Sequence, residues 1–255
     1  MLKYRVIPTL LLKDIGLVKG KLFNNSRRVG SILPAIKVYN NREVDELVIF
    51  DISATINSRP PDFDIIASIT PYCLMPLTVG GGITELIHIQ KLLQLGVDKV
   101  TINTAAYHNL KLIEDAANKF GSQCIVTCID AKKVATGTYS CFSKIGTHNQ
   151  NLNPVQWAKQ LENHGAGEIL ITSVEKDGTM SGYDLELISL ITNAVNIPVI
   201  ASGGAGEPEH AYQVITLAGA SAVAAASIFH FTEQTPLSIK HYLSQKGVPV
   251  RKNFL

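Results

Sequence analysis

Eight short apolar runs recur along the chain, and segments with helical spacing lie between them. The runs are RVIPTLL, ELVIFDI, MPLTV, DKVTIN, QCIVTCID, EILITSV, IPVIAS and AVAAASI. Apolar runs without polar alternation are typical of parallel strands that are buried on both faces. Strands that alternate with helices predict parallel βαβ units, and eight units of this size close into a barrel. We therefore predict an α/β fold, a single eight-stranded parallel βα barrel of the TIM type.

The segment at 83–96 illustrates the helical pattern between these runs. Leu86, Ile89, Leu92 and Leu93 fall on one helical face, and Gly96 follows as a stop signal. The polar stretches at 13–31, 55–63 and 135–153 predict long loops. A chain of 255 residues is ample for one large core. We expect a single barrel domain over residues 1–255.

The chain also repeats itself at about half its length. ELVIFD at 46–51 matches EILITS at 168–173, and PLTVGGG at 76–82 matches PVIASGG at 198–204, both at an offset of 122 residues. This period predicts two half-barrels, at about 1–120 and 121–255, with four strands in each. In the same alignment, Leu11 occupies the position that Asp130 has in the other half.

Two glycine turns lie at equivalent points of the two halves. Each follows a predicted strand and precedes a helix, where backbone N–H groups can face an anion. The strand after each turn ends in a pair of small residues, and Gly178 lies in a further turn at a strand end. The pattern predicts a site for two phosphate groups on opposite sides of the barrel mouth, made by Gly81, Gly82, Asn103, Thr104, Gly178, Gly203, Gly204, Ala226 and Ser227.

Acids at strand ends are the candidates for proton transfer. Asp51, Asp130 and Asp177 occupy such positions, where an aspartate can equally cap a helix or bind loop backbone. Asp130 follows an apolar strand and should face the barrel centre, where burial raises the pKa of a carboxyl group. Lys19, on the long first loop, either closes over a phosphate or stays a solvated charge. The candidate catalytic residues are therefore Asp130, Lys19, Asp51 and Asp177.

Four charged residues lie at or near strand starts, at the opposite end of the predicted barrel. They are Arg5, Glu46, Lys99 and Glu168. Two cations and two anions around one rim predict a plug of salt bridges. The structural interpretation of such a plug is stability at the barrel bottom.

Charge and composition exclude several classes of partner. Lys and Arg total 23 against 21 for Asp and Glu, with no basic tract, so we expect no nucleic-acid partner. The chain opens without a cationic segment followed by an apolar one, and its apolar runs have strand length. We expect a cytoplasmic protein that does not contact a membrane. The four cysteines lack CxxC spacing and the histidines lack HxxxH spacing, so we predict reduced thiols, no metal and no cofactor.

Several sequence blocks resemble one known family. GGGI, DKVTINTAA, GAGEILITS, KDGTMSGYD, VIASGGAG and AASIFHF are similar to the cyclase subunit of imidazole glycerol phosphate synthase, almost end to end. The resemblance implies a heterodimer with a glutaminase subunit. The barrel would accept ammonia from that partner and insert it into a bis-phosphorylated ribulose intermediate, closing an imidazole ring in histidine biosynthesis.

The resemblance also implies roles for single residues. The family has catalytic acids at the ends of the first and fifth strands; Asp130 matches the second, and the first falls on Leu11. Because a leucine cannot transfer a proton, we expect the usual cyclase activity to be impaired. Asp98 matches a position that docks the glutaminase, and the charged residues at the strand starts, Arg5, Glu46, Lys99 and Glu168, match the family's gate at the ammonia entrance.

The opening RVIPTLLLK resembles a divergent branch of the family, associated with bacterial surface-polysaccharide loci. That branch supplies ammonia for an acetamidino group on a sugar, and it implies a sugar or phosphorylated small molecule as acceptor and a sugar-amidating synthetase as a further partner. We predict this role. The ordinary cyclase of histidine biosynthesis and a non-catalytic ammonia conduit and scaffold for the glutaminase remain as alternatives.

Overall fold

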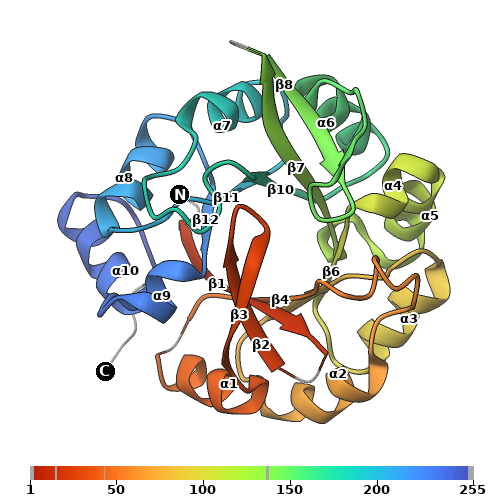
Figure 1. The fold of residues 1–255 in the computed structure, drawn as a ribbon, viewed down its shortest axis with the longest axis horizontal. Helices are drawn as coiled ribbons and strands as arrows, with labels where there is room; N and C mark the ends of the chain where they lie inside the picture. The colour runs from red at the N-terminus through yellow and green to blue at the C-terminus, as the bar shows by residue number, and fades with distance from the viewer. Residues whose placement is uncertain (1–2, 15, 43, 136–137, 252–255) are drawn as a thin grey trace.

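The structure is a computed structural model, and it describes residues 3–14, 16–42, 44–135 and 138–251. Eight parallel strands form a ring, which the pairing of β10 with β7 closes. Figure 1 looks along the barrel, with the helices outside the ring. The predicted fold is confirmed. The barrel strands are β1 (Arg5–Lys13), β4 (Leu47–Asp51), β5 (Leu77–Gly80), β6 (Lys99–Ile102), β7 (Ile125–Ala135), β10 (Glu168–Ser173), β11 (Val199–Ser202) and β12 (Ala222–Ala225).

Helices follow the strands and cover the outside of the ring. Side-chain caps start several of them; Asp62 and Asp184, for example, each accept a bond from a backbone N–H three residues on. The helices are α1 (Ile32–Asn41), α2 (Phe63–Ile69), α3 (Leu86–Gln94), α4 (Thr104–His108), α5 (Lys111–Phe120), α6 (Pro154–Asn163), α7 (Leu185–Thr192), α8 (Pro208–Thr216), α9 (Ser227–Phe231) and α10 (Pro236–Gln245), with 3₁₀ turns η1 (Thr70–Tyr72) and η2 (Ser122–Cys124).

Two layers of apolar side chains explain why the strand runs show no alternation. One large cluster packs the outward-facing side chains of the strands against the helices. A second cluster fills the interior of the barrel, so both faces of each strand are buried. Its members are Ile7, Val48, Val126, Cys128, Leu170, Ile200, Ala222 and Ala224, with Phe50 packed against them. This layer separates the charged rim at the strand starts from the mouth at the strand ends.

The predicted loops at 13–31 and 135–153 are wrong, because both stretches form hairpins. β2 (Gly16–Lys21) and β3 (Asn24–Gly30) extend β1, and β8 (Thr138–Ser143) and β9 (His148–Asn149) extend β7. Residues 16–19 are buried in spite of the polar composition around them. The prediction failed because these antiparallel strands extend beyond the end of the barrel and contain many polar residues. Residues 55–62 do lack helix and strand, as expected.

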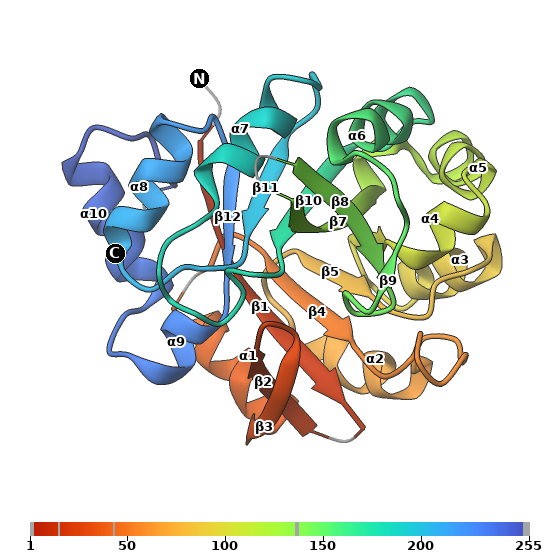
Figure 2. The ribbon, with the colours of Figure 1, turned by 45° about the horizontal axis from the view of Figure 1, so that its top comes forward.

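The β2–β3 hairpin lies across the barrel mouth (Figures 1 and 2). The N–H of Leu22 donates to the backbone oxygen of Asp177, 2.8 Å away, on the turn after β10. A Cβ atom added to Gly178 would come within 2.4 Å of the backbone oxygen of Gly20. Since only a glycine allows so close an approach, the hairpin and this turn form one wall of the mouth.

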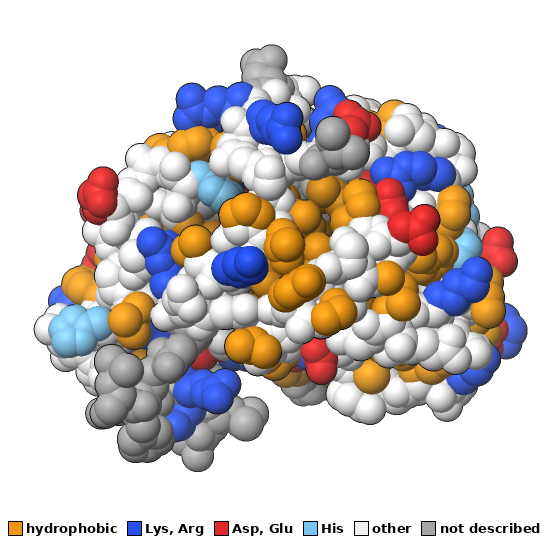
Figure 3. All heavy atoms as spheres, turned by 90° about the horizontal axis from the view of Figure 1, so that it is seen from below, with side chains coloured by type: hydrophobic (Ala, Val, Ile, Leu, Met, Phe, Trp, Pro, Cys, Tyr) orange, Lys and Arg blue, Asp and Glu red, His pale blue; other side chains and the backbone are white. Residues whose placement is uncertain are grey.

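The face that α1 and α2 present is chemically mixed. Figure 3 shows apolar side chains gathered in its middle, with Lys and Arg scattered among Asp and Glu around them. Val38 on α1 and Leu74 beyond α2 are among the exposed apolar residues of the protein. In the described part of the chain, no helix has the length and apolar character needed to cross a membrane.

Candidate active site at the barrel mouth

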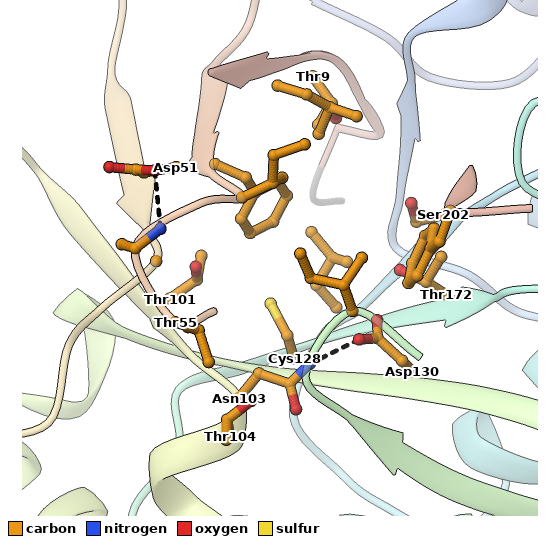
Figure 4. Close-up of a pocket in the computed structure, with 18 of the residues that line it drawn as sticks. Thr9, Asp51, Thr55, Thr101, Asn103, Thr104, Cys128, Asp130, Thr172 and Ser202 are labelled. Carbon is orange, nitrogen blue, oxygen red and sulfur yellow. Dashed lines mark hydrogen bonds between the residues drawn. The ribbon is translucent and has the colours of Figure 1, made fainter. Parts of the chain in front are cut away.

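A cavity of about 550 Å³ opens at the carboxyl ends of the barrel strands, the end at which βα barrels carry their active sites. Figure 4 shows polar side chains from several strands around it. The structure brings every candidate catalytic and phosphate-binding residue into its lining. These residues are Lys19, Asp51, Gly81, Gly82, Asn103, Thr104, Asp130, Asp177, Gly178, Gly203, Gly204, Ala226 and Ser227, and Leu11 lies among them.

Asp130 is the acid best suited to proton transfer. It lies on β7 and is 8 % exposed, and one of its carboxylate oxygens accepts a hydrogen bond from the Asn103 amide, 2.8 Å away (Figure 4). Burial raises the pKa of Asp130 to about 7; the Asn103 bond and the charge of Lys132 lower it, and the charge of Asp177 raises it further. At neutral pH the group is therefore poised between its acid and base forms.

Lys19 and Asp177 hold the hairpin against the turn after β10. The Lys19 ammonium contacts both carboxylate oxygens of Asp177, at 2.9 and 2.8 Å, and the lysine side chain is only 3 % exposed. The ammonium stays next to the cavity. In this arrangement each charge neutralises the other, so Lys19 has to exchange Asp177 for an anionic ligand before it can bind one.

Asp51 is occupied by local contacts. Its carboxylate accepts bonds from the backbone N–H groups of Ser53 and Ala54, from the Ser53 hydroxyl, and from Arg59, which lies 2.8 Å from the nearer oxygen. These bonds organise the loop between β4 and α2. The geometry therefore favours the loop-binding interpretation for Asp51 over proton transfer.

The two glycine turns have similar geometry. The equivalent residues Gly81 and Gly203 adopt φ values of +105° and +89°, and a Cβ atom on them would lie 2.1 and 2.7 Å from the backbone oxygens of Asp51 and Ser173. Glycine is therefore required at both positions. The residues that precede α4 and α9 also share an unusual backbone: φ −124° and ψ −89° for Asn103, φ −131° and ψ −63° for Ala226. The similarity supports the predicted relation between the halves of the chain.

Besides Oδ2 of Asp51, which lies in an ion pair with Arg59, three polar atoms of the described cavity wall are buried without a hydrogen-bond partner. They are Oγ1 of Thr9, Oδ1 of Asn103 and Oγ of Ser227. An unpaired buried polar group costs about 1–3 kcal/mol, which a ligand group can recover. Asn103 and Ser227 belong to the two predicted phosphate turns. The wall therefore has polar atoms available for a ligand on both sides of the mouth.

The middle of the cavity is apolar. Leu11, Phe50 and Leu170 line it between the two turns. The backbone pairing places Leu11 beside Phe50, since β1 and β4 are neighbours in the barrel. An aspartate at Leu11 would give this centre a second acid. With leucine, Asp130 is the one carboxyl group among the described cavity residues that lacks an ion pair and is buried.

The four charged residues at the opposite rim form a closed ring. The Arg5 guanidinium lies 2.8 Å from Glu46 and 3.1 Å from Glu168, and the Lys99 ammonium lies 3.1 and 3.2 Å from the same two residues. Thr78 donates a further bond of 2.7 Å to Glu46. Burial lowers the pKa of Arg5, but the two carboxylates outweigh it and raise that pKa. The predicted salt-bridge plug is present.

Asp98 lies next to this ring and is exposed, as the predicted docking residue should be. One of its carboxylate oxygens accepts a bond of 2.8 Å from the N–H of Leu77 at the start of β5. Asp98 therefore combines a structural contact at the start of β5 with an exposed side chain.

Sequence reasoning missed several cavity residues. Thr9 was recoverable, because it precedes Leu11 by two positions and so faces the same side of β1. Arg59 and Lys144 sit in irregular turns, where no periodicity indicates which residues reach the mouth. In the described ranges, no group of three or more His, Cys, Asp or Glu side chains is arranged to hold a metal ion.

Comparisons with known proteins agree with this arrangement. Residues 5–235 match the model of the histidine biosynthesis protein family. The chain is 48% identical over 251 residues to the imidazole glycerol phosphate synthase subunit HisF of Hydrogenobaculum sp., covering 98% of this chain and all of that protein. It is 46% identical to the same subunit of Saccharolobus solfataricus over 247 residues, covering 97% of this chain and 98% of the other.

These relatives bear on the predicted physiological role. Both are named as synthase subunits and neither for polysaccharide biosynthesis, so the predicted sugar-modifying branch finds no support in them. They favour the histidine-pathway alternative. The match spans the rim, the interior and the mouth of the barrel. On this similarity, the protein belongs to the HisF family of imidazole glycerol phosphate synthase subunits.

Proposed function

We propose that the chain is the cyclase-type subunit of a glutamine-dependent synthase in the cytoplasm. It takes ammonia from a partner glutaminase and adds it to a bis-phosphorylated acceptor, as the family resemblance implies; the relatives are named imidazole glycerol phosphate synthase subunits. One observation carries the proposal: unpaired polar atoms of Asn103 and Ser227 lie at two similar turns, with Asp130 at the same cavity. An acceptor with a phosphate at each end matches that arrangement.

In this mechanism the chain supplies binding, orientation and proton transfer. The glycine turns hold the phosphate groups through backbone N–H donors, with the side chains of Asn103, Thr104 and Ser227 beside them. A ligand fixed at both ends places its reacting centre near Asp130. Asp130 then takes a proton in its ionised form or gives one in its protonated form, and Asn103 keeps the carboxylate in place.

The proposal is tested by calorimetric titration of the protein with the bis-phosphorylated ribulose intermediate. We expect one binding site per chain. Substitution of Ser227 by alanine, which removes the hydroxyl and adds no bulk, should weaken binding about fivefold to fiftyfold, because it removes a donor to an anion. No heat of binding, together with no phosphate or sulfate at either turn in soaked crystals, would overturn the proposal.

Ammonia is proposed to enter through the charged rim. Near pH 7 free ammonia is protonated in bulk water and loses its nucleophilicity, so it must pass from the partner shielded from solvent. The ring of Arg5, Glu46, Lys99 and Glu168 closes the bottom of the barrel, and a small rearrangement of its ion pairs would open it. The exposed Asp98 beside the ring would help to dock the glutaminase.

Lys99→Ala is expected to uncouple the two reactions. Removing the ammonium breaks two of the four ion pairs of the ring, so the path is no longer sealed. Glutamine hydrolysis by the complex should continue, while product formed per glutamine consumed falls at least twofold. The measurement is the ratio of glutamate to product. The matched control is Lys91→Ala on α3, a lysine outside the ring. An unchanged ratio in Lys99→Ala would show that ammonia does not pass through the charged rim.

One observation favours a second candidate function, amidination of a sugar. Leu11 removes the acid that ring closure requires in the family, whereas the turns, Asp130 and the rim are all present. A complex that only delivers ammonia to an activated sugar could use these parts without a second acid. Incubation of the complex with glutamine and each candidate acceptor, read by product mass, distinguishes cyclisation from amidination. Glutamate without any aminated product would favour the scaffold interpretation.

A further inference from the structure

Charge pairing inside the cavity singles out one lysine. Lys19, Arg59 and Lys144 are the lysines and arginines that line it. Lys19 is bound to Asp177 and Arg59 to Asp51. Within the part of the chain that the structure describes, Lys144 is the only one of the three without an ion pair. Its charge is available to a ligand without breaking a contact.

The backbone holds Lys144 against one of the two turns. Its N–H donates to Oγ1 of Thr104, 3.2 Å away, which ties the turn after β8 to the start of α4. Lys144 and Ile145 both have positive φ values, +47° and +56°. This conformation is unfavourable for a branched residue such as isoleucine and persists only where the surroundings enforce it. The position of Lys144 next to Thr104 is therefore defined.

The two ends of the cavity differ in charge. The end with Gly178, Gly203, Gly204, Ala226 and Ser227 is bordered by Lys19 and Asp177, whose charges neutralise each other in an ion pair. The turn with Gly81 and Gly82 is bordered by Lys144, by the histidines His88 and His108, and by the exposed carboxylate of Glu85. An anion at this end would be repelled by Glu85, and Lys144 is the unpaired cation that offsets it.

We propose that Lys144 is a specificity-determining residue whose ammonium binds the phosphate held at the Gly81, Gly82, Asn103 and Thr104 turn. The inference rests on the proposed function for the identity of the ligand. A phosphate monoester carries close to two negative charges above pH 7, so a free lysine favours it over a neutral or singly charged end group. The flexible side chain of lysine acts as a point charge and needs no fixed bidentate geometry. Lys144 thus selects an acceptor phosphorylated at both ends over one phosphorylated at the opposite end alone.

The test compares binding of the bis-phosphorylated ribulose intermediate by four proteins: the wild type, Lys144→Gln, Lys144→Arg and the control Lys37→Gln on the exposed face of α1. In calorimetry at pH 7.5 and low salt, Lys144→Gln should bind about tenfold more weakly. Lys144→Arg keeps the charge and should stay within about threefold of the wild type. Lys37→Gln should match the wild type. The gap between wild type and Lys144→Gln should narrow as salt rises, because salt screens the charge.

The outcomes separate this inference from the proposed function. Wild-type protein that fails to bind the bis-phosphorylated ligand contradicts the proposed function and, with it, the ligand assigned to Lys144. If the wild type binds the ligand and Lys144→Gln binds it equally tightly, the result contradicts the role of Lys144 but not the proposed function. Weakening by Lys144→Arg equal to that by Lys144→Gln would also overturn the inference, because it would show that shape rather than charge matters. Thermal unfolding of each variant checks that the fold is kept; Lys144 is exposed, so we expect no change.

Discussion

Asp130→Asn is expected to lower product formation by the synthase complex about a hundredfold to ten-thousandfold, the usual effect of losing a general acid or base. Asparagine has nearly the same shape and keeps a carbonyl oxygen for the bond from Asn103. What it removes is the ability to take and give a proton. The measurement is the rate of product formation with saturating acceptor and with ammonium salt in place of glutamine, so that the glutaminase does not limit it. A loss smaller than about threefold would exclude Asp130 as the proton-transfer group.

The pH profile should identify the protonation state that works. Because burial raises the pKa of Asp130 to about 7, its ionised fraction grows as pH rises through that value. If the rate-limiting step needs a base, the wild-type rate rises to a plateau above pH 7; if it needs an acid, the rate falls over the same range. Either inflection should vanish in Asp130→Asn. An inflection near pH 7 that persists in the variant would assign it to another group.

The same raised pKa makes a prediction for stability that is independent of activity. A carboxyl group with a higher pKa in the folded protein than in the unfolded chain binds its proton more tightly when folded. The free energy of unfolding of the wild type should therefore fall as pH rises from about 4 to about 7 and then level off, by an amount on the order of 4 kcal/mol at most. Asp130→Asn lacks this loss. It should be as stable as the wild type or more stable above pH 7, which shows that lost activity is not lost folding.

The barrel itself was predictable from the sequence, and for a physical reason. A strand buried on both faces leaves a continuous apolar run, and β4, β10 and β11 each show one. The charged ring was equally accessible, since Arg5, Glu46, Lys99 and Glu168 precede or begin barrel strands. In any parallel barrel the strand starts lie at one rim and the strand ends at the other. The position of a residue along its strand therefore predicts the rim at which it lies.

Turns and pairing between distant segments were not predictable in this way. The stretch at 13–31 is polar, yet it pairs as β2 and β3, and its buried Lys19 is paired with Asp177, which lies 158 positions further along the chain. The ion pair of Asp51 with Arg59 and the proximity of Lys144 to Thr104 are set by loop conformation. Two consecutive residues with positive φ leave no periodic signal in a sequence.

Leu11→Asp is expected to create or raise cyclase activity on the bis-phosphorylated ribulose intermediate. Leu11 is half-buried at the end of β1 and lines the same cavity as Asp130, so an aspartate there would add a second acid at the mouth. Lys19, the turns and Asp130 are already in place. A general acid or base is worth about a hundredfold to ten-thousandfold in rate where its surroundings position it. Phe50 and Leu170 offer the new carboxyl no hydrogen bonds, so we expect a smaller gain in rate, of at least tenfold.

The matched variant Leu11→Asn separates acid chemistry from polarity. Asparagine has the size of aspartate and hydrogen-bonds as well, but it cannot transfer a proton at neutral pH. Ring closure should therefore rise in Leu11→Asp and stay at the wild-type level in Leu11→Asn, when imidazole product is followed with the glutaminase and glutamine present. The double variant Leu11→Asp with Asp130→Asn should lose the gain, because the two acids act on one ligand from opposite sides of the barrel. Wild-type protein that closes the ring at the rate of the HisF relatives would show instead that Asp130 suffices and that the missing acid at Leu11 is not needed in this chain.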